Sequence, residues 1–391
     1  MPIRSYILPV IVFSQFCCTS LWFAGNAIIT DLISNFNLEV SALAHLTSAV
    51  QFGFIIGTFV FAILNIADRF SPSKVFFICA VVAASLNLFT VFDANNLRSL
   101  FLIRFGTGFF LAGIYPVGMK IASDYFKEGL GKSLGYLVGA LVLGTAFPHF
   151  LNVYNQDISW KVIVYFTSSM ALIGGGMIMF FVADGPYKTK LEKFNISVFY
   201  SVFKIKKFRT AAFGYFGHMW ELYAFWAFTP VILNGYLYFH KNIDFNVSLY
   251  SFIIIASGAI SCVFSGYLSQ KYTPKKVATV ALTLSGLCCL LSPLIFVINS
   301  EIFFLSFLIF WGMVVIADSP LFSTLVAQNV PNTIKGTALT IVNSIGFAIT
   351  IISIQLLNSL SNNFEIRFLF LFLAVGPVVG LIELYKSLRK E

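Results

Sequence analysis

Charged side chains are scarce in this sequence of 391 residues. Asp, Glu, Lys and Arg together make up 10% of it, against about 25% in an average soluble domain. Hydrophobic residues make up 58%, and the mean hydropathy is +0.88. So few charges cannot cover a surface that faces water. The composition therefore excludes soluble globular, disordered and fibrous proteins and predicts an integral membrane protein.

Motifs that carry catalysis or bind cofactors are missing as well. The six cysteines lie inside apolar runs, without metal-ligand or disulfide spacing, and are expected to be small apolar fillers. The sequence has no nucleotide-binding loop of the Walker type, no Ser/His/Asp order typical of a hydrolase and no cluster of metal ligands. We therefore expect no catalytic residue, no metal and no cofactor, and a membrane-embedded enzyme is the weaker alternative. Uphill transport of a solute would have to use an ion gradient.

The sequence is instead built from apolar runs. Divided at its polar, charged and Pro/Gly clusters, it gives twelve segments, each long enough to cross about 30 Å of hydrocarbon. The first follows Arg4 and is too long for a signal-peptide core, so it is expected to be an uncleaved span. The predicted spans are 6–30, 43–66, 75–92, 99–122, 132–151, 161–183, 209–235, 247–269, 277–298, 302–325, 336–359 and 366–386.

Two halves of the chain resemble each other. The segment Arg69–Val75 has a counterpart in Lys271–Val277, 202 residues later, and Pro116 has one in Pro320, 204 residues later. A nearly constant offset predicts two parallel six-helix repeats. The longest polar stretch separates them. The predicted domains are an N-terminal six-helix bundle (1–183), a cytoplasmic central loop (184–208) and a C-terminal six-helix bundle (209–391).

The basic residues are distributed unevenly between the loops. With the N-terminus inside, twenty of the 25 Lys and Arg residues fall in cytoplasmic segments, four fall outside, and Arg104 lies within a span. This bias predicts a multi-pass protein of the cytoplasmic (inner) membrane with both termini in the cytoplasm. It accounts for the excess of positive charge without nucleic acid. The expected partners are the lipid bilayer, a small-molecule substrate and protons, and the expected state is a monomer.

One loop motif and one helix motif resemble those of a known family. Ala67–Lys74 is similar to the signature loop between helices two and three of the major facilitator superfamily of secondary transporters, and Arg104–Gly108 is similar to its helix-four motif. The family pattern has Gly at the positions of Leu64 and Ser71 and a basic residue at Ser73. Longer stretches resemble one widespread, poorly characterised bacterial branch: Ser20–Ala27, Tyr115–Ala122, Gly217–Ala224 and Ala317–Ala327.

The resemblance implies an all-α membrane fold of twelve helices in two pseudo-symmetric bundles, with alternating access. It also disfavours two sub-families. Proton-linked drug exporters carry a Gly-Pro element in helix five, which is missing here, and nitrate carriers use an Arg in helices two and eight, which the spans 43–66 and 247–269 lack. The predicted function is a secondary active transporter for a small organic solute, and proton coupling is expected. A transport-inactive sensor or scaffold is the other alternative.

Two acids lie well inside predicted spans, where an ionisable side chain is expensive and indicates function. Glu221 shares a helix face with His218, three residues earlier, and Asp318 precedes the helix breaker Pro320. The family's helices one, four, seven and ten line the cavity, so all three would face substrate or water. Glu221 is expected to carry the coupling proton, with Asp318 as the alternative carrier or a substrate contact. Alternatively, Glu221 only pairs with His218, and the proline only kinks its helix for packing.

Further side chains are candidates for the substrate and proton pathway. Lys120 either reaches the inner cavity or only snorkels to the membrane surface. Arg104, Lys120, His149 and His218 outnumber the acids, which hints at an anionic or zwitterionic substrate. The remaining candidates are Tyr115, at the break of helix four, and Asn26 and Trp22, which are equally suited to a buried interhelical hydrogen bond.

Three residues are expected to form a gate. By the family pattern, Asp68 approaches the N-terminus of helix eleven, where the helix dipole favours a negative charge, and Arg69 then pairs with Asp124. The alternative is that these are ordinary charges of the cytoplasmic face.

Overall fold

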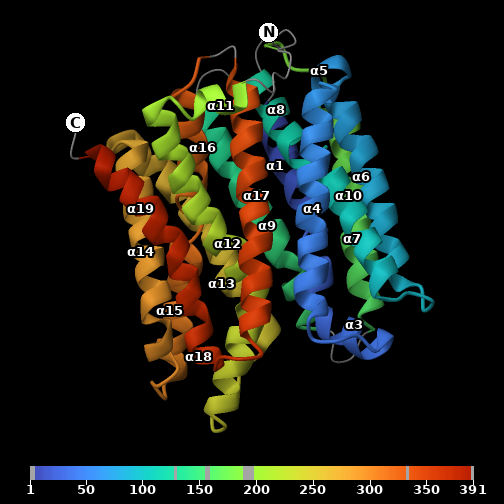
Figure 1. The fold of residues 1–391 in the computed structure, drawn as a ribbon. Coiled ribbons are helices and arrows are strands. Elements are labelled where there is room, and N and C mark those ends of the chain that lie inside the picture. The colour runs from blue at the N-terminus through green and yellow to red at the C-terminus, as the bar shows by residue number, and fades with distance from the viewer. Residues whose placement is uncertain (1–4, 127–129, 155–158, 188–197, 332–333, 389–391) are drawn as a thin grey trace. The chain divides into compact units, whose positions relative to one another are not determined.

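The computed structural model describes residues 5–126, 130–154, 159–187, 198–331 and 334–388. These residues form α-helices and short 3-10 helices, and no strand is present among them (Figure 1). Residues 188–197 of the predicted central loop and the side chain of Lys132 lie outside the described part. All six cysteines are buried and free, as expected for apolar fillers.

The chain divides into two compact units, Met1–Lys193 and Phe194–Glu391. The division lies inside the predicted central loop. The helices of the N-terminal unit are α1 (Ile7–Thr19), α2 (Ala24–Ala27), α3 (Ile29–Phe36), α4 (Ala42–Ile63), α5 (Ile66–Arg69), α6 (Pro72–Leu88), η1 (Phe89–Val91), α7 (Leu97–Leu111), α8 (Tyr115–Tyr125), α9 (Leu130–Asn152) and α10 (Lys161–Phe181). Those of the C-terminal unit are α11 (Val198–Val202), α12 (Lys206–Phe239), α13 (Val247–Lys271), α14 (Pro274–Ile295), α15 (Glu301–Val314), α16 (Ser319–Gln328), α17 (Lys335–Leu360), α18 (Ile366–Leu369), η3 (Phe370–Ala374) and α19 (Val375–Leu388).

Ten helical segments of the described chain are long and apolar enough to cross a membrane. They correspond to ten of the twelve predicted spans. The other two are the first, whose helix α1 has only 13 residues, and the seventh, α12, whose 34 residues include several polar side chains. The all-helical membrane fold is confirmed, and the twelve-helix architecture is consistent with these segments.

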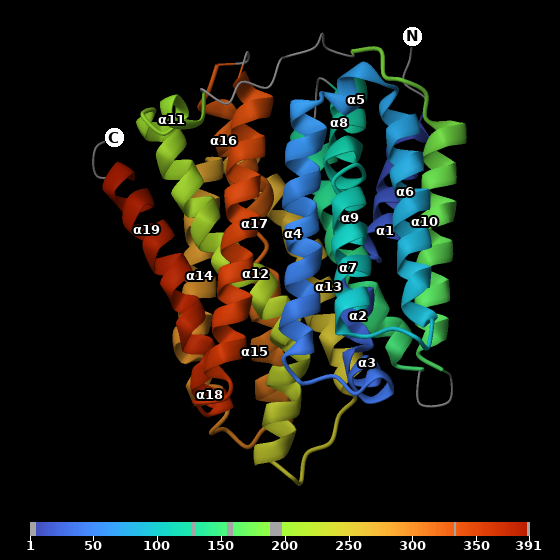
Figure 2. The ribbon, with the colours of Figure 1, turned by 45° about the vertical axis from the view of Figure 1, so that its right-hand side comes forward.

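The first predicted span is interrupted, which the sequence did not indicate. α1 ends at Thr19, Ser20–Phe23 are irregular, and α2 and α3 follow at one end of the unit, opposite α5 (Figure 2). Irregular backbone is tolerated at membrane depth only where other groups satisfy its carbonyls. Arg104 on α7 does so, because its guanidinium donates to the carbonyl oxygens of Leu21 and Trp22.

The two units break a helix at corresponding places. α7 ends at Leu111 and α8 begins at Tyr115, while α15 ends at Val314 and α16 begins at Ser319. The helices that follow the two breaks, α8 and α16, begin 204 residues apart. Pro116 and Pro320 each lie at the second position of the new helix, where the missing amide hydrogen costs no bond. The repeated prolines therefore mark a repeated helix start.

Glycines let α4 and α7 approach backbone to backbone. A Cβ at Gly53 would overlap the carbonyl of Phe105, and one at Gly108 would overlap that of Val50. Small residues at such contacts are typical of packing between membrane helices.

We predict that Gly53→Ala lowers the free energy of unfolding by about 2 kcal/mol, because backbone cannot move aside as a flexible side chain can. Gly176→Ala in α10 is the matched control, since nothing lies within 4 Å of its added Cβ. The check is thermal unfolding of the purified variants. Equal melting temperatures for the two variants would contradict the close approach of α4 and α7.

Candidate functional site

A buried polar cluster lies inside the C-terminal unit. His218 and Glu221 lie one turn apart on α12, and Asp318 is the residue that precedes α16. The Nδ1 atom of His218 is 2.8 Å from Oδ1 of Asp318, and these side chains are 1% and 0% exposed. The structure therefore brings all three sequence-predicted residues of this unit together.

The break in the tenth span explains the position of Asp318. Its backbone carbonyl accepts the first helical hydrogen bonds, from the amides of Leu321 and Phe322 at 3.0 and 2.9 Å. Its carboxylate does not cap these amides and instead contacts His218. A carboxylate at a helix N-terminus is favoured by the helix dipole, while the histidine supplies a second positive charge when protonated.

Glu221 has different partners. The indole Nε1 of Trp311 on α15 donates to Oε1 at 2.6 Å, and the hydroxyl of Ser285 on α14 donates to Oε2 at 2.9 Å. All three side chains are buried. Glu221 is thus fixed by donors from two other helices, and the direct pair with His218 that the sequence allowed is replaced by the pair between His218 and Asp318.

The pair keeps unused hydrogen-bonding capacity. Among the described residues, neither Nε2 of His218 nor Oδ2 of Asp318 has a hydrogen-bond partner. An imidazole and a carboxyl group can each exist in a protonated and a deprotonated form. A proton can therefore bind at Nε2 of His218 or at Oδ2 of Asp318 without breaking a hydrogen bond to another described residue.

The predicted basic residues of the N-terminal unit are engaged elsewhere. Arg104 is 2% exposed and its guanidinium is bound to the backbone of the interrupted first helix, with Nη1 at 3.0 Å from the oxygen of Leu21. Lys120 on α8 lies 2.9 Å from Asp68 and 3.5 Å from Asp124. The count of cations that hinted at an anionic substrate thus includes two that are already bound to other groups.

The other candidates lie around the interrupted helix. Asn26 on α2 donates to the hydroxyl of Thr47 at 2.7 Å, an interhelical hydrogen bond. Trp22 packs on Phe54 with ring centroids 4.8 Å apart. Two further candidates are Tyr115, the first residue of α8, and His149, which is buried in α9 after Pro148.

The predicted gate residues are only partly brought together. Asp68 and Asp124 share Lys120, whereas Arg69 is exposed and, among the described residues, forms no ion pair with Asp124. Among the described residues Lys120, one helical turn before Asp124, forms the ion pair that was predicted for Arg69, and gating by these residues stays a prediction. The approach of Asp68 to the N-terminus of the eleventh span involves the other unit and stays a prediction.

We predict that Asp68→Asn and Lys120→Gln each slow transport about tenfold while leaving solute affinity unchanged, because the ion pair biases a conformational equilibrium. Arg69→Gln is the matched control and is expected to transport at the wild-type rate. The measurement is the initial rate against solute concentration, with binding measured separately. A parallel loss of binding in Asp68→Asn would place this residue in the solute site instead.

Sequence reasoning missed Trp311 and Ser285. Trp311 lies in an apolar run and Ser285 in a helix rich in small residues, so neither differs from ordinary packing residues by type or spacing. Only the convergence of α12, α14 and α15 reveals their role as donors to Glu221.

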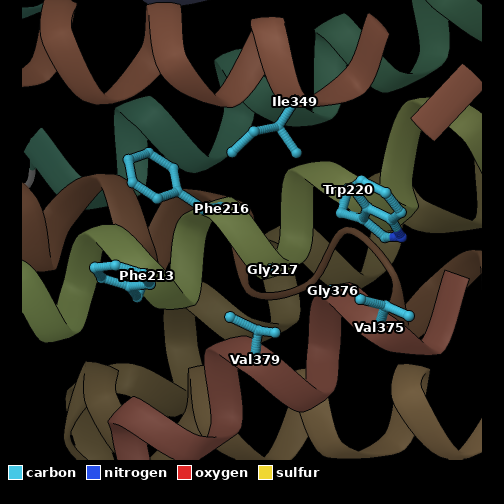
Figure 3. Close-up of a pocket in the computed structure, with 8 residues that line it drawn as sticks. All are labelled: Phe213, Phe216, Gly217, Trp220, Ile349, Val375, Gly376 and Val379. Carbon is cyan, nitrogen blue, oxygen red and sulfur yellow. The ribbon is translucent and has the colours of Figure 1, made fainter. Parts of the chain in front are cut away.

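A pocket of about 200 Å³ lies elsewhere in the C-terminal unit, between α12, α17 and α19 (Figure 3). Among the residues that line the pocket, only Trp220 has a polar side-chain group. Its indole nitrogen already donates to the carbonyl of Phe372 at 3.1 Å. The pocket therefore suits an apolar chain and not a polar solute. Its lining residues are Phe213, Phe216, Gly217, Trp220, Ile349, Val375, Gly376 and Val379. No group of three or more potential metal ligands occurs in the described part of the chain.

Comparisons with known proteins agree with this architecture. Two solved structures of a bacterial homologue of the human lysosomal transporter Spinster are similar in fold. The inward-facing, unoccupied form has a TM-score of 0.74 at 15% identity, covering 99% of this chain and 97% of that one. The inward-facing, occupied form has a TM-score of 0.71 at 14% identity, covering 100% and 97%. No curated protein matches the sequence significantly.

The family comparison covers most of the sequence. The family model of the Major Facilitator Superfamily matches residues 11–354. This match includes the interruption of the first span, both proline-marked helix breaks and the whole buried cluster. The chain therefore belongs to the Major Facilitator Superfamily.

Proposed function

We propose that this protein is a proton-coupled secondary transporter that moves a small organic solute across the cytoplasmic membrane by alternating access. Family and fold support a secondary transporter that works by alternating access. The single observation that carries proton coupling is the buried contact of 2.8 Å between His218 and Asp318.

The energetic argument starts from the cost of buried charge. An ionised side chain inside a membrane protein persists only where it is paired or functional. In the proposed cycle, His218 and Asp318 share an ion pair in one state. A proton taken up by Asp318 removes its negative charge and weakens its hold on the imidazole. The pair can then favour one of two conformations according to its protonation, which is what coupling requires.

The contacts favour Asp318 over Glu221 as the carrier. Glu221 accepts hydrogen bonds from Trp311 at Oε1 and from Ser285 at Oε2, so a donor occupies each of its oxygens. Asp318 has one imidazole partner and one oxygen without a hydrogen-bond partner in the described chain. Asp318 can therefore take up a proton at its unused oxygen without displacing a hydrogen-bond donor, whereas Glu221 cannot.

The test is solute accumulation by the purified protein in proteoliposomes. A panel of carboxylates, amino acids, sugars and polyols is offered with and without an imposed pH gradient. We expect at least one solute to accumulate only with the gradient and to be released by a protonophore. Accumulation that ignores both the gradient and the protonophore would contradict proton coupling.

The proposed orientation places both termini in the cytoplasm. We predict that a membrane-impermeant maleimide applied from outside labels Asn242→Cys but not Gln270→Cys, because these exposed positions lie at opposite ends of α13, the first just before it and the second in its last turn. The six native cysteines are buried, so the background is low. Labelling of Gln270→Cys from the outside would reverse the orientation.

A further inference from the structure

The N-terminal unit contains buried hydrogen-bonding side chains without partners. Both amide atoms of Gln15 and of Gln51 lack a hydrogen-bond partner among the described residues, and both side chains are 0% exposed. The same holds for Nε2 of His149 and the hydroxyl of Thr145. Buried polar groups are normally satisfied, and each exception costs free energy. The orphaned amides and imidazole of this unit therefore call for an explanation.

Three of these residues lie on α1 and α9, two helices that pack against each other. Gln15 lies on α1, which packs against both α8 and α9 (Figure 2). Gly118 on α8 has no side chain, and a Cβ there would overlap Oε1 of Gln15, so the glycine makes room for the amide. Gly144 on α9 is similarly close to Thr19 on α1, one turn beyond Gln15.

The remaining groups lie on α9 and α4. Thr145 follows Gly144 directly, and His149 lies one turn further along the same face of α9. Gln51 on α4 lies one turn before Phe54, whose ring packs on Trp22 in the interruption of the first helix.

The charges of this region determine which solute would fit. Arg104 is bound to the carbonyls of Leu21 and Trp22, and Lys120 is bound to Asp68 and Asp124. A buried anion would need an unbound cation as its partner. The groups that are left, two amides, an imidazole and a hydroxyl, can all donate and accept hydrogen bonds. They match an uncharged solute rich in hydroxyl or carbonyl groups.

We propose that the N-terminal unit binds an uncharged, polyhydroxylated or carbonyl-rich solute through Gln15, Gln51 and His149. The inference rests on the proposed transport function and names its substrate class. It assigns solute recognition to the N-terminal unit and proton binding to the C-terminal cluster.

The test is the melting temperature of the purified full-length protein at one pH. The probes are D-ribose, D-glucose, myo-inositol and uridine as uncharged solutes, succinate and lactate as anions, and putrescine and choline as cations. We expect at least one uncharged probe to raise the melting temperature and the charged probes to have no effect. Stabilisation by a charged probe, or by none of the uncharged ones, overturns the proposal.

Three variants separate recognition from folding. Gln15→Leu and Gln51→Leu remove amides that have no partner, so each should melt no lower than the wild type. Each should also bind the stabilising probe at least about tenfold more weakly. Asn87→Leu is the matched control, because this buried amide donates to Ser168 and Thr167 at 2.9 and 3.2 Å. It should melt lower and keep its response to the probe.

The outcomes are distinct. If Gln15→Leu and Gln51→Leu melt as low as Asn87→Leu, the two amides are structural and the proposal fails. If both variants respond to the probe like the wild type, it also fails. Because no proton gradient is present, this assay can fail while proton-coupled accumulation is observed, and the reverse is equally possible.

Discussion

Asp318→Asn is expected to abolish accumulation of solute driven by a pH gradient. The amide keeps the size and the acceptor oxygen of the carboxyl, but it cannot bind or release a proton. The variant should still exchange internal for external solute down its own gradient, since exchange needs no net proton movement. The measurement compares gradient-driven uptake with counterflow in the same proteoliposomes. We expect uptake to fall to the level of empty liposomes and counterflow to persist.

Asp93→Asn is the control for this experiment. Asp93 pairs with Lys161 at 2.7 Å, but its side chain is 79% exposed, so loss of its charge should leave both activities unchanged. If Asp318→Asn accumulates solute with the normal pH dependence, Asp318 does not carry the proton. Glu221 would then be the next carrier to test.

Glu221→Ala is expected to lower stability strongly. Removal of the carboxylate leaves the indole nitrogen of Trp311 and the hydroxyl of Ser285 buried without their acceptor. An orphaned buried group costs about 1–3 kcal/mol, so two of them should together lower the melting temperature by several degrees or prevent folding. Glu221→Gln should fold, because its amide can accept from the indole and donate to the hydroxyl.

The two substitutions also separate structure from coupling. Glu221→Gln should retain gradient-driven accumulation, in contrast to Asp318→Asn. Thermal unfolding and uptake are measured on the same preparations, with Ser285→Ala as a milder variant that removes one donor. Normal stability of Glu221→Ala would contradict a structural role for its hydrogen bonds with Trp311 and Ser285. Loss of accumulation in folded Glu221→Gln would indicate that Glu221 carries the proton.

Much of the architecture could be predicted from the sequence, because membrane spans are specified locally. Each predicted span corresponds to helical segments of the structure, since an apolar run that crosses a bilayer must satisfy its own backbone. Pro116 and Pro320 likewise marked the starts of α8 and α16, because proline acts on its own helix. Glu221 and Asp318 could be selected because an acid inside an apolar run is costly.

The partners of these residues could not be predicted, because they depend on distant segments. His218 pairs with Asp318, which is 100 residues later in the chain, although Glu221 is only three residues away. The role of Arg104 depends on an interruption of the first helix that no proline marks. Lys120 replaces Arg69 as the partner of Asp124 because α8 turns this lysine towards the acids. The type of side chain and its place in a span indicate which residues are functional candidates, whereas the packing of distant helices determines which residues they contact.

The most direct test of the account is infrared difference spectroscopy of the purified protein between pH 5 and pH 8. The account predicts a band of a protonated carboxylic acid at low pH that disappears as the pH rises. This band should persist in Glu221→Gln and be lost in Asp318→Asn. A band that is unchanged in Asp318→Asn and lost in Glu221→Gln would contradict the claim that Asp318 carries the proton.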